Sequence, residues 1–193
     1  SEWVKTPQLD RLAATGTVFS NARVTASICR PTLMSLLTGL DPIQWDQELL
    51  TGRLASPGYS GAELIRHVDT LPRLLQQRGY VSFQGGKYWE GTFEAAGFTH
   101  GMTDRQDDAL TPSGGPGIAL GLETMQPVYD FIDAHTDEPF LIWFAPKLPH
   151  VPHKPPGEYR RLYANSGLNN AARLYYGMCS WFDALAGDLL AHL

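Results

Sequence analysis

Three side chains that could take part in catalysis stand next to short apolar segments: Cys29, Lys87 and His150. Cys29 comes directly before Arg30 and an apolar stretch that is typical of a helix. A thiol at a helix N-terminus meets unpaired backbone N–H groups and the positive end of the helix dipole, which favour an anion beside it. Cys29 is therefore a candidate reactive centre. The plainer alternative is a buried structural thiol, because free cysteines are often small core residues.

The elements before Cys29 are predicted from caps and periodicity. Thr6 followed by Pro7 predicts the start of a helix over Pro7 to Thr15, and Gly16 ends it. The alternating segment Thr17 to Thr25 predicts a short strand, and the next helix is expected over Pro31 to Thr38. Cys29 would then lie at a strand-to-helix corner.

The rest of the chain predicts five further elements. A helix capped at Thr70 ends near Gln77, and the apolar segment Tyr80 to Gly86 predicts a buried strand that places Lys87 just beyond its end. Helical spacing returns over residues 122–134 and again over residues 169–193. Between those two helices, the dense apolar run FLIWFA predicts a central parallel strand, and a proline-rich loop with His150 follows it.

This alternation of helices and strands predicts an α/β fold with a mostly parallel sheet and helices on both faces. Such sheets bind ligands outside the carboxyl ends of their strands, so the loops that carry Cys29, Lys87 and His150 are expected to converge. Residues 102–121 are rich in Asp, Gly, Pro and Ser, which indicates a loop or lid insertion.

Composition excludes several classes of protein. The 193 residues are 43% hydrophobic and 18% charged, enough for one sizeable core, and the longest apolar run is far shorter than a membrane span. We therefore expect no membrane partner. A net charge of −5 without any Lys/Arg run argues against nucleic acid as a partner. Cys29 and Cys179 are too far apart to suggest a disulfide framework.

Three segments together resemble the sulfatase family of the alkaline phosphatase superfamily. TPQLDRLAATGTVFSNARVTASICRPTLMSLLTG is similar to the opening of the family, which leads to its C-x-P-x-R motif. DTLPRLLQQRGYVSFQGGKYWEG is similar to the stretch that contains G-K-W-H, and PFLIWFAPKLPHVPHKPPGEY is similar to the P-H-x-P segment. The resemblance spans nearly the whole chain, so we expect residues 1–193 to be part of a single sulfatase catalytic domain.

The resemblance implies a sulfuric ester hydrolase whose motif cysteine, here Cys29, is converted by a maturation enzyme to formylglycine. Lys87 matches the family lysine and would neutralise a sulfate oxygen, and His150 matches the P-H-x-P histidine, which binds the sulfate or protonates the leaving group. A sulfated carbohydrate is the implied substrate class. A periplasmic or secreted location is implied as well, although no export signal is read in this chain.

Two positions depart from the family motifs. The motif arginine falls on Leu33, and an arginine follows the cysteine directly instead, at Arg30. Either Arg30 supplies the guanidinium from a shifted position, or Cys29 stays a thiol and the site is altered. The family histidine of G-K-W-H falls on Trp89, which cannot act as an acid or base, and His100 is a candidate replacement.

The resemblance also implies a divalent cation, usually calcium, with the modified Cys29 among its ligands and the other ligands in carboxylate pairs outside this chain. The adjacent Asp107 and Asp108 and the pair His150 and His153 are assigned to no metal site. Without those carboxylate pairs, we expect little or no sulfatase activity from the 193 residues alone. Two other functions stay open: a phosphate or phosphonate monoester hydrolase of the same superfamily, and a non-catalytic relative that binds anions or glycans.

Overall fold

The computed structural model describes residues 3–44, 65–104 and 115–193. They form two compact units, of which one is Ala22–Pro146 and the other joins Ser1–Asn21 with Lys147–Leu193. We call them the sheet unit and the helical unit. In the described ranges, no helix combines the length and the apolar character that a bilayer crossing needs.

The sheet unit is built on three parallel strands. Strand β1 (Val81–Gly86) lies between β2 (His100–Gly101) and β3 (Phe140–Ala145), and it runs parallel to both. A parallel pair needs a crossover connection, and α6 (Gln126–Ala134) lies in the connection that leads to β3. The predicted α/β class with a parallel sheet is therefore confirmed. The expectation that β3 would be central was wrong, because β1 occupies the middle of the described sheet and β3 is only half-buried.

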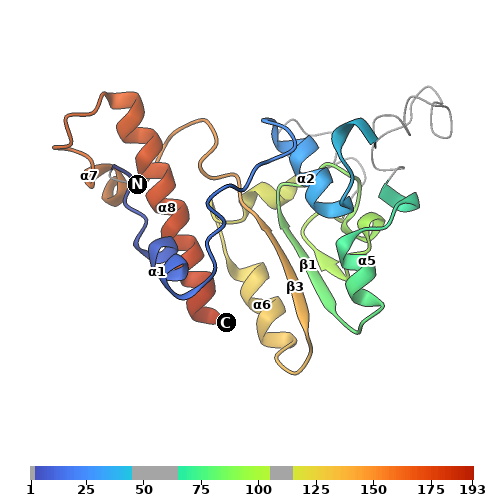
Figure 1. The fold of residues 1–193 in the computed structure, drawn as a ribbon. Coiled ribbons are helices and arrows are strands. Elements are labelled where there is room, and N and C mark those ends of the chain that lie inside the picture. Colours follow the sequence, from blue (N-terminus) through green and yellow to red (C-terminus); the bar gives the residue numbers. More distant parts are fainter. Residues whose placement is uncertain (1–2, 45–64, 105–114) are drawn as a thin grey trace. The chain divides into compact units, whose positions relative to one another are not determined.

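Helices cover both faces of this sheet. Phe83 on β1 packs against Phe131 of α6, with ring centroids 5.2 Å apart. Its neighbour Gln84 pairs with Trp143, which packs against Phe98 in a different cluster. Since successive side chains of a strand point to opposite faces, the two clusters lie on opposite faces. Figure 1 shows α6 on one side of β1 and β3, and α2 and α5 on the other.

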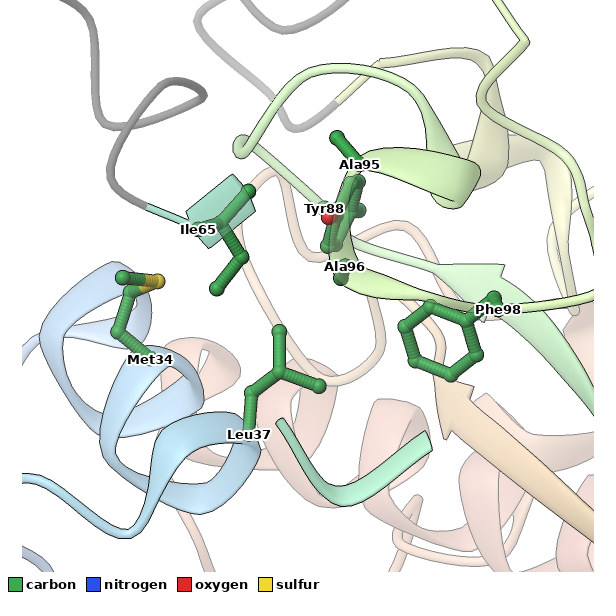
Figure 2. Close-up of a cluster of buried hydrophobic side chains, with 7 residues drawn as sticks. All are labelled: Met34, Leu37, Ile65, Tyr88, Ala95, Ala96 and Phe98. Carbon is green, nitrogen blue, oxygen red and sulfur yellow. The ribbon is translucent and has the colours of Figure 1, made fainter. Parts of the chain in front are cut away.

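The cluster on the second face holds α2 (Cys29–Thr38) in place. Met34 and Leu37 of α2 are 2% exposed. They pack with side chains from the segments that precede and follow β1 in the chain (Figure 2). The other members are Ile65, Tyr88, Ala95, Ala96 and Phe98, of which the two alanines end the short helix η1 (Phe93–Ala96). Burial of each large apolar side chain contributes roughly 1.5–3 kcal/mol. The inner face of α2 is thus anchored, while its first residue is exposed.

Most predicted helices form close to the expected bounds. Helix α1 is Pro7–Thr15, α5 is Leu71–Gln76 with Thr70 as its cap, and α2 begins two residues earlier than expected. The predicted strand over Thr17 to Thr25 was wrong. That segment has no regular structure and is exposed, with Phe19 78% exposed, because alternation forms a strand only where a neighbouring strand can pair with it.

The predicted loop over residues 102–121 lies partly outside the described residues, which resume at Gly115. The described part contains the short helix η3 (Pro116–Ala119), which lies against the end of β1. A side chain at Gly117 would collide with the carbonyl oxygen of Gly86, so the two backbones can approach only because position 117 is glycine. A role as a lid stays a prediction.

The helical unit packs α1 and α7 (Gly157–Arg161) against α8 (Asn170–His192). Asp183 of α8 is 2% exposed, and its carboxylate accepts hydrogen bonds from the backbone N–H groups of Gln8 (3.1 Å) and Leu9 (2.8 Å). These groups lie in the first turn of α1, where no helix carbonyl is available to them. Asp183 therefore caps a helix from a distance of 174 residues in the chain.

Asp183→Ala is expected to lower the free energy of unfolding by about 2 kcal/mol, because it leaves two backbone donors without an acceptor. Urea unfolding followed by circular dichroism measures this loss. Asp188→Ala, at an exposed position on the same helix, is the matched control and should change stability by less than about 0.5 kcal/mol. Equal effects in the two variants would argue against the capping role.

Candidate active site

The structure brings together two of the predicted site residues, Cys29 and Lys87. Cys29 is the first residue of α2, and Lys87 is the first residue after β1. The ammonium Nζ of Lys87 lies 3.8 Å from the Sγ of Cys29. The thiol is exposed and Lys87 is half-buried, so a small anion could reach both groups from solvent. The strand end and the helix start predicted from the sequence therefore meet at one place.

The start of α2 leaves its backbone donors without a side-chain cap. The capping position is Ile28, whose side chain accepts no hydrogen bond. The preceding segment is tied back to the helix instead: the hydroxyl of Thr32 donates to the carbonyl of Ala26 (2.5 Å), and the hydroxyl of Thr25 donates to Ser35 (3.0 Å). Cys29 thus lies at a fixed helix start where backbone N–H groups and the dipole favour negative charge.

Lys87 is held by its backbone. Its N–H donates to the carbonyl of Ala145 (2.6 Å), and its carbonyl accepts from the indole N–H of Trp143 (3.4 Å). The preceding Gly86 has a φ of +94°, and a side chain there would collide with Ala145. Glycine is therefore required at the turn that directs Lys87 out of the sheet.

Arg30 does not point freely into solvent. Its Nε and Nη2 donate to the two carboxylate oxygens of Glu90, at 2.7 and 2.8 Å. The side chain of Glu90 is 4% exposed and that of Arg30 is 46% exposed. The hydrogen bonds with Glu90 raise the pKa of Arg30 despite its partial burial. This two-pronged ion pair links the residue after Cys29 to the loop that carries Lys87.

Glu90 is a site residue that the sequence analysis did not identify. Only its place in the GKYWEG segment and the presence of an arginine beside the cysteine hint at the pair. A single sequence contains no signal that pairs two residues 60 positions apart.

Leu33 stands where the resemblance places the motif arginine. With Met34, Leu37 and Trp143 it lines a small cavity that also touches Lys87 and the ion pair of Arg30 and Glu90. The cavity has a volume of about 10 Å³, which suits about one water molecule. Leu33 thus contributes apolar surface to the wall of this cavity and provides no hydrogen-bond donor. Trp89, at the position of the family histidine, lines the same cavity.

His100 is not brought together with Cys29 and Lys87. It is paired with Phe83, three residues before the end of β1, and its ring packs against His135 and Phe131 of the α6 region. Burial lowers the pKa of His100, and the neighbouring His135 lowers it further. These contacts place it on the face of the sheet that α6 covers, so the structure gives no support to His100 as a replacement for the family histidine.

His150 belongs to the helical unit. It is exposed, and its Nδ1 lies 2.8 Å from the carbonyl oxygen of Val151. This contact fits an Nδ1–H donor, which leaves Nε2 as the acceptor. The peptide bonds before Pro149 and Pro152 are both cis. The local geometry thus presents one ring nitrogen of His150 to solvent.

The described residues do not make a calcium site. In residues 3–44, 65–104 and 115–193, no group of three or more His, Cys, Asp or Glu side chains could hold a metal ion. The pair Asp107 and Asp108 lies outside these ranges. Calcium prefers six to eight oxygen ligands, and both carboxylate oxygens of Glu90 already accept hydrogen bonds from Arg30.

Comparison with known proteins gives a consistent family assignment. The family model described as Sulfatase matches residues 1–193. An N-acetylgalactosamine-6-O-sulfatase of Bacteroides thetaiotaomicron is 38% identical over 88 residues, which are 46% of this chain and 16% of the relative. An N-acetylgalactosamine-6-sulfatase of Canis lupus familiaris is 36% identical over 91 residues, which are 45% of this chain and 17% of the relative.

A solved structure has the same fold. The crystal structure of Ps i-CgsB superposes with a TM-score of 0.71 at 22% identity, over 98% of this chain and 49% of that chain. The present chain therefore spans about half of the solved protein, and its matched segments span less than a fifth of the two curated relatives.

Proposed function

This chain belongs to the sulfatase family, and we propose that the protein containing it hydrolyses a sulfate monoester with the nucleophile at position 29. The observation that carries this proposal is the distance of 3.8 Å between Nζ of Lys87 and Sγ of Cys29, at the uncapped start of α2. An anion bound there would meet a positive side chain and backbone N–H groups at the same time.

Each residue has a defined part in the proposed reaction. A formylglycine at position 29 would supply a hydrated aldehyde whose hydroxyl attacks sulfur while the bond from sulfur to the alcohol oxygen breaks. The second hydroxyl of the sulfated hydrate would then lose its proton and expel sulfate, which restores the aldehyde. Lys87 neutralises charge on a sulfuryl oxygen as the transition state forms. His150 binds the sulfate or protonates the leaving alcohol oxygen, a role that rests on the family resemblance alone. Arg30 acts through Glu90, because their ion pair fixes the start of α2 against the loop of Lys87.

The residues around Cys29 are compatible with this modification in one respect and depart from the family in another. The side chain is exposed at the first residue of a helix, so it is accessible to a modifying enzyme. The arginine of the family motif is replaced by Leu33, which offers no donor to the modified group. The maturation enzyme, the divalent cation and a secreted or periplasmic location are parts of the proposal that rest on the family.

A sulfated carbohydrate is the proposed substrate class. The support comes from the relatives, two of which are named for sulfate on the 6-position of N-acetylgalactosamine. The identity to each is below 40% over less than half of the chain, so the sugar and the linkage are left open.

The decisive experiment compares an aryl sulfate with the matched aryl phosphate, using the full-length protein co-expressed with a maturation enzyme. Turnover of the sulfate is expected to dominate. Turnover of the phosphate alone would replace the sulfatase proposal by the phosphate ester alternative. Mass spectrometry of the tryptic peptide with Cys29 tests the modification, since formylglycine has lost sulfur and gained oxygen. A fully retained thiol, together with sulfated glycan binding but no turnover, would favour the non-catalytic alternative.

Lys87→Ala is expected to lower kcat/KM for the sulfate ester by about 10²–10³-fold, because the loss of one preorganised charge contact costs about 3–4 kcal/mol in the transition state. Lys87→Arg should retain part of the activity. The matched control is Arg78→Ala, which removes an exposed cation from the turn before β1. An unchanged kcat/KM in Lys87→Ala would remove Lys87 from the mechanism.

A further inference from the structure

We propose that Arg160, Arg161 and Arg173 of the helical unit form a second binding site, which takes a sulfate group carried by a saccharide. The three arginines line one cavity of about 170 Å³, together with Ala164 and Asn170. No step of the proposed reaction uses this cavity.

Two helix ends build the cavity. Helix α7 ends with Arg160 and Arg161, and α8 begins at Asn170 and places Arg173 one turn inside. Asn169 accepts a hydrogen bond from the N–H of Ala172 (2.9 Å), so part of the α8 start is already capped. The binding capacity must therefore come mainly from the guanidinium groups, to which the positive helix end adds a smaller attraction.

The positive charge of the cavity is uncompensated within the described part of the chain. None of the three arginines makes an ion pair there. Burial raises the pKa of the Tyr159 hydroxyl, and the carboxylates of Glu158 and Asp188 raise it further. Three cations that line one cavity repel each other. An anion bound between them would be attracted to all three and would offset this repulsion.

Arg173 is held at the cavity and has one unsatisfied donor. Its Nε is buried and has no hydrogen-bond partner among the described residues. Its Nη1 donates to the carbonyl of Ala164 (3.3 Å), which holds the guanidinium plane at the cavity. A buried donor without an acceptor is unfavourable, so this guanidinium has a hydrogen-bonding capacity that the described residues leave unused.

The chemistry suits a tetrahedral oxyanion. Planar guanidinium groups bind such oxygens through paired N–H donors, and arginine does this better than lysine. Sulfate and phosphate share this chemistry. The choice of sulfate on a saccharide rests on the proposed function, because a sulfated carbohydrate is the proposed substrate class. A cavity of about 170 Å³ leaves room for the group and part of its sugar.

The test measures equilibrium binding of a sulfated hexasaccharide that carries 6-sulfated N-acetylgalactosamine, its desulfated counterpart and inorganic phosphate to the 193-residue chain. The sulfated probe is expected to bind at least about tenfold more tightly than the desulfated one. Arg173→Gln and the double variant Arg160→Gln/Arg161→Gln should each weaken binding by about tenfold or more, which corresponds to about 1.4 kcal/mol for a charged hydrogen bond. Phosphate that competes as well as sulfated saccharide would overturn the choice of a sulfated saccharide.

Controls separate the site from general attraction and from misfolding. Arg11→Gln removes an exposed arginine of α1 in the same unit and should leave binding unchanged. Arg173→Lys keeps the charge but loses the planar donors, so intermediate binding is expected. Helix content by circular dichroism should be unchanged in every variant used. Equal losses in Arg11→Gln and Arg173→Gln, or no saturable binding by the wild type, would overturn the proposal.

Failure of this proposal and failure of the proposed function are distinguishable. Binding is measured also with Lys87→Ala, which lacks the cation of the proposed active site. Retained binding in Lys87→Ala together with weakened binding in Arg173→Gln supports the arginine site whether or not the enzyme is active. Lost binding in Lys87→Ala with unchanged binding in Arg173→Gln would show that the saccharide binds beside position 29 instead.

Discussion

Cys29→Ala, made in the full-length protein, is expected to lower kcat for a sulfate ester by on the order of 10³- to 10⁶-fold, as removal of a covalent nucleophile does in other hydrolases. The physical reason is that alanine provides no nucleophile at the start of α2, whereas Lys87 and the backbone donors stay in place. Steady-state kinetics on an aryl sulfate measure the loss.

The substrate affinity of this variant provides a second readout. Because the binding groups around position 29 are unchanged, Cys29→Ala should still bind the unreacted ester with a Kd near the wild-type KM. Cys179→Ala is the matched control, since Cys179 is the other free cysteine and lies on α8 in the helical unit. Activity retained in Cys29→Ala but lost in Cys179→Ala would assign the wrong cysteine to the reaction.

The ion pair of Arg30 and Glu90 is expected to respond asymmetrically to mutation. Arg30→Met leaves the carboxylate of Glu90, which is 4% exposed, without its partner, and should lower the free energy of unfolding by about 3 kcal/mol. Glu90→Gln leaves Arg30, which is 46% exposed, accessible to water, and should cost about 1 kcal/mol. Denaturant unfolding of the 193-residue chain measures both losses.

The double variant Arg30→Met/Glu90→Leu completes the test. An apolar pair removes the uncompensated charge, so this variant should be more stable than Arg30→Met alone. Arg78→Met, at an exposed position, is the control for loss of one arginine charge. Equal losses in Arg30→Met and Glu90→Gln would mean that burial of Glu90 does not determine the energy of the pair.

Much of the fold could be predicted because its signals are local. Proline, glycine and capping residues marked α1 and α5, and the apolar run Tyr80 to Gly86 located β1 and hence Lys87. The segment Thr17 to Thr25 failed because pairing, which a strand requires, depends on a neighbour that the local pattern does not contain. The position of β3 at the side of β1 could not be predicted for the same reason.

The candidate site likewise has features that local sequence signals predict and features that depend on distant residues. The sequence by itself determined the family, a helix that starts within two residues of Cys29 and the strand end before Lys87, because residue type and local periodicity carry that information. Only the tertiary structure decided that Arg30 is bound by Glu90 and that His100 packs against His135. The two residues of each pair are far apart in the chain. They meet only because the sheet and its covering helices bring their backbones together.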